Sequence, residues 1–180
     1  MAYERILVRE NIYHLQQGIE LMERMGDELY RRNDPARFGS GPGKHFRHIL
    51  DHYLSFIGGL QGEIDYDARE RDARLEDDCR YAMGKTREII ADLEKLLDQP
   101  QILQRAVQVI SNEGEEAGNG APGSQSTLKR ELQFLLSHTV HHYALIALIL
   151  RIQGFETPKE FGVAPSTLKY QKSLAEECAP

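Results

Sequence analysis

Three histidines lie in one of the most apolar stretches of the chain. The segment from Phe134 to Leu150 reads FLLSHTVHHYALIALIL and contains His138, His141 and His142. Histidine is only an intermediate candidate for burial, and its ring nitrogens need partners when they leave water. Helical residues four apart lie about 40° apart around the axis and about 6 Å apart along it. His138 and His142 therefore share one helix face, where two imidazoles can bind one cation.

A second histidine-rich segment lies far upstream. The stretch GKHFRHILDHYL contains His45, His48 and His52, which share one helix face at spacings of three and four. Catalytic zinc usually has three protein ligands and one open position, so a histidine from this face would complete the site. The seventh histidine, His14, is alone in the first helical segment, and a surface or core-edge position is expected for it.

The same two-histidine spacing occurs in zinc metalloproteases, whose motif places a glutamate directly after the first histidine. Thr139 occupies that position here, which argues against a metalloprotease. For His45, His52 and His141, hydrogen bonding at the rim of the site is favoured over coordination. These three histidines, together with Asp51, are candidates for supporting the ligands or transferring protons. A solvated helix carboxylate is an equally open interpretation of Asp51.

Four segments with helical periodicity must position these residues. Proline suits a first helical turn, so Pro42 begins the second helix. Ser126 or Thr127 can cap the fourth helix, and Gly154 ends it. The predicted helices cover about residues 5–32, 42–56, 75–97 and 127–153.

The connections differ in character. Alternating residues from Val107 to Ser111 predict a short strand, and a loop rich in glycine and serine is expected at 112–126. The polar connection at 59–73 is long for a helical bundle, and long ordered loops tend to be functional. Its residues either pin the connection to the bundle or shape a substrate pocket. Those considered are Asp65, Tyr66, Asp67 and Arg69.

Composition limits the class of protein. The chain has 180 residues, 41% of them hydrophobic and 28% charged, as expected for one soluble globular domain. A net charge of −6 gives no reason to expect binding to nucleic acid or to an anionic membrane. Cys79 and Cys178 form no metal or redox spacing. The N-terminus does not resemble a secretory signal, and the apolar run from Tyr143 to Leu150 is too short to span a bilayer. A cytoplasmic protein is therefore expected.

Two of these patterns together resemble the DinB/YfiT-like superfamily of metal-binding four-helix bundles. One is Gly43 followed five residues later by His48, and the other is the box HTVHH. The resemblance implies an all-α, four-helix bundle with a short strand and loop insertion between helices 3 and 4. The length fits a single domain over 1–180, with the bundle at about 5–153, and the tail at 154–180, which has three prolines, is expected to drape over it.

The resemblance also implies that His48, His138 and His142 are the metal ligands, in agreement with the helical geometry. Zinc and nickel both suit three imidazoles. Many relatives follow the histidine box with an Arg-Gly-Gln-type segment, whereas Tyr143 and the two residues after it follow here, so the role of that segment is not carried over.

Two hypotheses for function stay open. Characterised relatives include S-transferases that use a low-molecular-weight thiol, which implies a metal-dependent enzyme with a small-molecule substrate or thiol as its partner. The alternative is a non-catalytic module, either metal-stabilised or stress-responsive, in which Asp51, His45 or His52 completes the coordination sphere. A homodimer is also expected, because homodimers occur among similar proteins.

Overall fold

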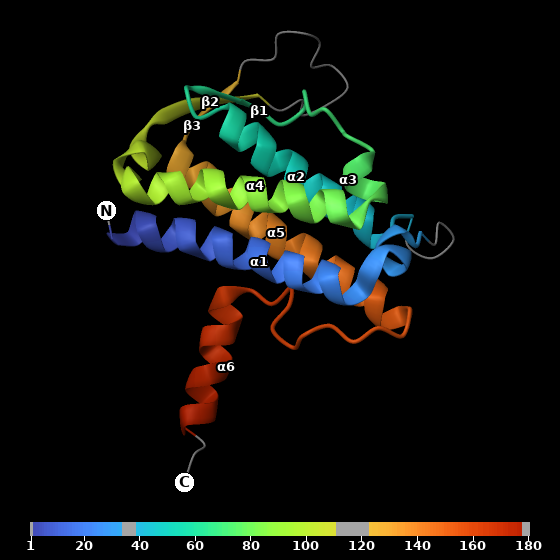
Figure 1. The fold of residues 1–180 in the computed structure, drawn as a ribbon. Coiled ribbons are helices and arrows are strands. Elements are labelled where there is room, and N and C mark those ends of the chain that lie inside the picture. Colours follow the sequence, from blue (N-terminus) through green and yellow to red (C-terminus); the bar gives the residue numbers. More distant parts are fainter. Residues whose placement is uncertain (1, 34–38, 111–122, 178–180) are drawn as a thin grey trace.

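Four long helices form the body of the molecule. The computed structural model describes residues 2–33, 39–110 and 123–177. The long helices are α1 (Ala2–Arg31), α2 (Pro42–Gly58), α4 (Cys79–Asp98) and α5 (Leu128–Ile152). Among these four helices, α1 packs most closely on α4 and then on α5, and α2 packs most closely on α5 and then on α4 (Figure 1). The predicted all-α class and four-helix bundle are confirmed.

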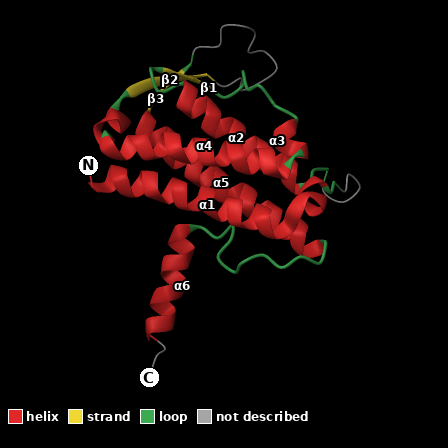
Figure 2. Ribbon diagram, viewed as in Figure 1, coloured by secondary structure: helices red, strands yellow, loops and turns green. Residues whose placement is uncertain are grey.

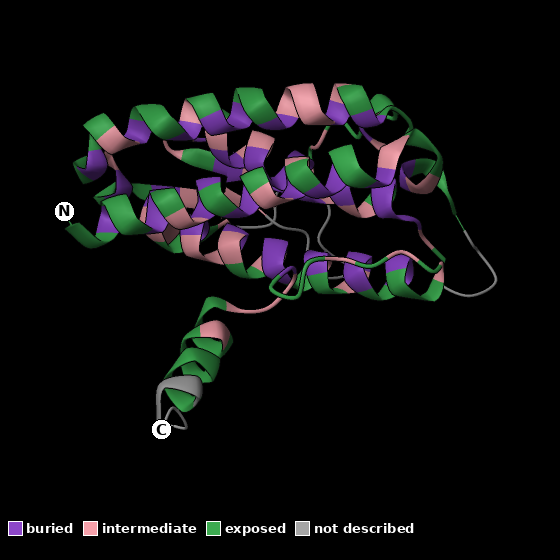
Figure 3. Ribbon diagram, turned by 60° about the horizontal axis from the view of Figure 1, so that its bottom comes forward, coloured by how far each residue is buried: buried purple, intermediate pink, exposed green. Residues whose placement is uncertain are grey.

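The apolar stripes of the helices meet in one core. Each helix buries one side and exposes the other, as Figure 3 shows for the whole bundle. The largest fully buried side chains are aromatic, and they are Tyr30, Tyr53, Tyr143, Phe46 and Phe56. α5 is apolar and long enough to cross a membrane by length and composition alone, but the core helices of soluble proteins pass the same test. Its packing against α1 and α2 is that of a core helix.

A small sheet lies across one end of the bundle (Figure 2). Its strands are β1 (Glu63–Asp65), β2 (Ala106–Ile110) and β3 (Ser124–Thr127), in the order β1-β2-β3. β1 runs parallel to β2, with Ile64 opposite Val109, and β3 runs antiparallel to it, with Ser126 opposite Val107. The prediction placed a strand only in the insertion between the third and fourth long helices. The sheet extends beyond that insertion, because β1 comes from the connection that follows α2.

Local capping explains where the helices begin and end. The predicted helix over 75–97 is divided at Asp78, whose carboxylate accepts from the Tyr81 amide at 2.9 Å. The short helix α3 (Arg74–Asp77) precedes that break. A 3-10 turn, η1 (Pro100–Gln104), follows α4. Thr127 caps α5 by accepting from the Arg130 amide at 3.2 Å, as expected. Most of the predicted loop at 112–126 lies outside the described residues, and 124–126 belong to β3.

The C-terminal tail has two structurally different parts. Its first part lies against the bundle, where the buried ring of Phe161 stacks on Tyr143 with 4.3 Å between ring centroids. The second part forms α6 (Pro165–Glu177), which points away from the bundle (Figure 1). Its Tyr170 and Leu174 are exposed. The expectation that the whole tail drapes over the bundle is therefore wrong for α6, where Pro165 begins a helix instead of continuing the extended chain.

We predict that replacing Gly43 by alanine destabilises the fold. A Cβ atom at this position in the first turn of α2 would lie 2.1 Å from the Glu76 carbonyl oxygen of α3, so backbone must move. The expected loss in free energy of unfolding is about 1–3 kcal/mol, measured by urea unfolding.

Gly84→Ala is the matched control, because Gly84 lies inside α4 and an added methyl group would meet no neighbouring atom within 4 Å. There the change should raise the free energy of unfolding by about 0.5–1 kcal/mol, through helix propensity. Equal effects of the two substitutions would contradict the tight approach of α2 to α3.

Candidate metal centre

The contact between α2 and α5 brings the two histidine faces together. His45 Nδ1 lies 2.9 Å from His142 Nδ1, and His48 Nε2 lies 3.1 Å from His138 Nε2. The ring of His52 lies near Phe134, with centroids 6.2 Å apart. Residues later in α2 thus face residues earlier in α5, so the helices are antiparallel and their histidine faces meet.

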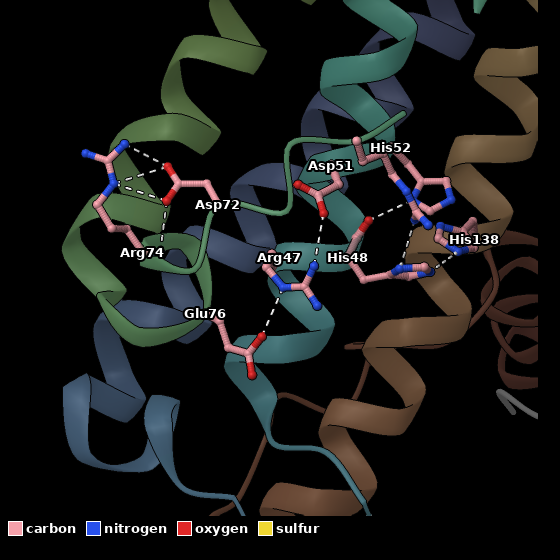
Figure 4. Close-up of polar contacts among 9 residues, drawn as sticks. Arg47, His48, Asp51, His52, Asp72, Arg74, Glu76 and His138 are labelled. Atoms are coloured by element: carbon pink, nitrogen blue, oxygen red, sulfur yellow. Dashed lines mark hydrogen bonds and ion pairs between the residues drawn. The ribbon is translucent and has the colours of Figure 1, made fainter. Parts of the chain in front are cut away.

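Three ring nitrogens converge at the centre of this contact. His138 Nε2 lies 3.1 Å from His48 Nε2 and 3.1 Å from His142 Nε2. One ring nitrogen has a single proton or a single lone pair, so it cannot satisfy both neighbours by hydrogen bonding. Three imidazoles around a tetrahedral ion at about 2.05 Å would hold their nitrogens about 3.3 Å apart. Figure 4 shows the rings of His48 and His138 directed toward each other from the two helices. The cluster is compatible with metal binding.

His45 and Ser40 can fix the orientation of His142. His45 Nε2 lies 2.9 Å from Ser40 Oγ. If His45 donates from Nε2 to Ser40, its Nδ1 is free to accept the Nδ1 proton of His142. That arrangement leaves the Nε2 lone pair of His142 facing the other two rings. Supporting contacts of this kind commonly set the tautomer of a ligand histidine. His138 differs, because its Nδ1 is buried without a hydrogen-bond partner among the described residues.

A guanidinium group lies behind His48 and His52. Arg69 Nη1 is 3.2 Å from His48 Nδ1 and 3.3 Å from His52 Nδ1. The Nδ1 of His52 also lies 2.7 Å from the His48 carbonyl oxygen, to which it donates. His52 further stacks on Tyr66, with ring centroids 5.3 Å apart. His52 is thus placed beside the cluster and is held by its own contacts.

Two of the residues singled out from the sequence lie elsewhere. The expected support of His48 by Asp51 is not observed: Asp51 is buried and forms an ion pair with Arg47 at 3.2 Å (Figure 4). It is therefore not a solvated carboxylate either. His141 is exposed and only meets His142 edge-on, at 5.2 Å between centroids.

His14 also lies outside the cluster. It is buried, so the expected surface position is wrong. Its Nδ1 donates to the Glu10 carbonyl oxygen of its own helix at 2.8 Å. The geometry separates this lone histidine from the six others.

Burial keeps the converging histidines uncharged. It lowers the pKa of His138 to about 2, of His48 to about 3 and of His142 to about 4, and the neighbouring imidazoles lower each pKa further. A neutral imidazole offers its lone pair to a cation, whereas an imidazolium does not. The three rings are therefore in the ligand-competent state at neutral pH.

A cavity of about 540 Å³ opens beside the cluster, within the size range of small-molecule sites. Its walls come from α2, the connection after β1, the sheet and the start of α5. One wall holds Glu131, a buried carboxylate that accepts from Tyr66 Oη at 3.0 Å and from Ser126 Oγ at 2.5 Å. Nothing in the sequence pattern singles out Glu131, since its surroundings depend on the packing of the sheet against α5.

The low pKa values predict that metal binding releases few protons. At about pH 6, three histidines of ordinary pKa would together release about two protons when they bind a metal. The histidines of this site are already neutral there, so release should be close to zero. Isothermal titration with zinc in buffers of different ionisation enthalpy measures this number. Release of two protons would show that the rings are solvated and do not form the buried cluster.

Comparison with known proteins places the chain in a family. FK506-binding protein 5 of Rhizopus delemar is 31% identical over 113 residues, which cover 61% of this chain and 28% of that protein. The chain thus matches little more than a quarter of that relative. No solved structure matches. The sequence profile of the DinB superfamily matches residues 10–146. Because this match covers most of the chain, including the whole histidine cluster, the protein belongs to the DinB superfamily.

Proposed function

We propose that this protein is a divalent-metal-dependent enzyme of the low-molecular-weight thiol S-transferase type. His48, His138 and His142 would hold the ion, zinc or nickel, and a small-molecule thiol would reach it from the adjacent cavity. The observation that carries the proposal is the convergence of three Nε2 atoms, from helices far apart in sequence, beside a cavity of substrate size.

The surroundings of the cluster favour an open coordination sphere over a closed structural one. A structural site needs a fourth protein ligand. Asp51 is engaged by Arg47, and both ring nitrogens of His45 are engaged by Ser40 and His142. The group of donors within 4.8 Å of one another holds only the three histidines among the described residues. A position for an exogenous ligand would therefore remain.

The proposed chemistry needs a reactive thiol at the metal, which a small molecule would supply. A divalent ion held by three neutral imidazoles supplies a strong Lewis acid, which lowers the pKa of a bound thiol toward neutrality. Cys79 does not meet this need, because burial raises the pKa of its thiol to about 12 and its Sγ lies against the Met22 carbonyl oxygen. The histidines would hold the site together, and the cavity wall would orient the substrate.

The activity in the name of the Rhizopus relative is not a basis for the function of this chain. FK506 binding is stated for a whole protein, of which the match covers 28%. The histidine cluster gives a more direct basis for function than that name does.

We predict that His138→Ala abolishes stoichiometric zinc binding while the bundle remains folded. His138 Nε2 is the nitrogen that approaches both other rings, so its loss removes the centre of the cluster. Metal content after dialysis, measured by mass spectrometry, and helical circular dichroism are the readouts.

His141→Ala is the matched control, since His141 is an exposed histidine on the same helix. It should keep its metal. Full metal content in the His138 variant would remove the basis of the site.

We also predict that thiols bind the metal directly. A low-molecular-weight thiol added to the cobalt-substituted protein should produce a sulfur-to-cobalt charge-transfer band in the near ultraviolet, because the open position accepts a thiolate. The His138→Ala protein should give no such band. If metal is bound but no thiol changes the spectrum, the site is structural or uses water, and the transferase proposal fails.

A further inference from the structure

Arg69 is a half-buried cation beside the candidate metal centre. Among the described residues its guanidinium forms no ion pair, and its Nε is buried without a hydrogen-bond partner. Its Nη1 contacts only two imidazole nitrogens, on His48 and His52. Partly buried guanidinium groups are well suited to a carboxylate or phosphate, with which they form charge-assisted hydrogen bonds.

The nearby carboxylates with known partners are engaged elsewhere. Asp51 pairs with Arg47, and Glu131 accepts from Tyr66 and Ser126. The connection that carries Arg69 has its own ion pair, in which Asp72 binds Arg74 at 2.8 Å. The charge of Arg69 acts on Asp51 from a longer distance, but none of these three carboxylates forms a direct ion pair with Arg69.

The contact with His48 also conflicts with metal binding. A histidine that gives Nε2 to a cation carries its proton on Nδ1, so it can no longer accept a hydrogen bond there. Arg69 only donates. With His48 acting as a ligand, the guanidinium would need another acceptor, and the cavity is the accessible place for one.

Arg69 and Arg130 both line this cavity, together with His48. Arg130, like Arg69, forms no ion pair with a described residue. Only one imidazole ring separates the Arg69 guanidinium from the converging nitrogens. A small molecule could thus meet the histidine cluster with one end and Arg69 with the other.

We propose that the small-molecule thiol carries a carboxylate, and that Arg69 binds this carboxylate from the cavity wall while the sulfur faces the histidine cluster. The inference rests on the proposed thiol-dependent function and names the class of thiol. Arg69 acts as a binding and specificity residue, with Arg130 as a secondary cation at the cavity mouth.

The test compares two thiols that differ only in the group of interest, 3-mercaptopropionate and 3-mercaptopropan-1-ol. Their affinities for the cobalt-substituted protein are read from the charge-transfer band. The unmodified protein should bind the carboxylate about tenfold more tightly, as expected for one charge-assisted contact. In Arg69→Gln the two affinities should become nearly equal, while binding of the alcohol stays unchanged.

Arg80→Gln is the matched control, because Arg80 is an exposed arginine on α4 that does not line the cavity. It should keep the tenfold preference, and the cobalt content of all three proteins is measured first. Equal affinities in the unmodified protein would overturn the proposal. So would a preference that survives Arg69→Gln, since the carboxylate would then bind elsewhere, such as to the ion itself.

A second experiment separates this proposal from the thiol chemistry. Propionate keeps the carboxylate and lacks the sulfur, so its binding is followed by isothermal titration of the metal-loaded protein. Arg69→Gln should weaken it about tenfold and Arg80→Gln should not. Absence of a thiol band together with Arg69-dependent propionate binding would reject the transferase function and keep the carboxylate site. Propionate binding that is absent, or that ignores Arg69, would reject the carboxylate site.

Discussion

The antiparallel contact between α2 and α5 is the constraint on which the candidate site depends. Each helix alone places its histidines along one face, but two nitrogens on one helix cannot surround a cation. The packing of these helices brings His48 Nε2 and His142 Nε2 to 3.1 Å from His138 Nε2. The same packing removes the rings from water, which keeps them neutral. The close approach of the histidine rings and their removal from water thus have a single cause, the burial of the apolar faces of the two helices.

The rest of the fold controls what surrounds that contact. The sheet at one end of the bundle places Ser126 and the adjoining Tyr66 against Glu131, and these three residues line the cavity. The connection after β1 carries Arg69 to the outer side of His48. In the core, Tyr53 donates to Asn11 at 2.8 Å, so these two buried polar side chains are satisfied within the fold. Among the described residues, the buried groups without a hydrogen-bond partner are Arg69 Nε and His138 Nδ1 at the cluster and the side-chain amide of Gln153 at the end of α5.

Sequence patterns were sufficient to predict the long helices but not to predict the whole sheet. Long apolar periodicity predicts the four bundle helices to within a few residues, because each must bury a continuous stripe. β1 and β3 have three and four residues and are largely polar, so no alternation reveals them; their pairing with β2 does. Asp51 was misjudged for a related reason. Its helical position is right for supporting His48, but its carboxylate pairs with Arg47, four residues earlier on α2.

By itself the sequence determined that two helices each carry histidines on one face, since that follows from the 3.6-residue period. Family resemblance narrowed the candidate ligands to His48, His138 and His142. Only the tertiary structure decided that His45 contacts His142, that His52 stacks on Tyr66, and that Arg69 lies behind His48 with no ion pair to another described residue. These contacts join side chains from elements that are far apart in the sequence, and helical periodicity carries no information about contacts of that kind.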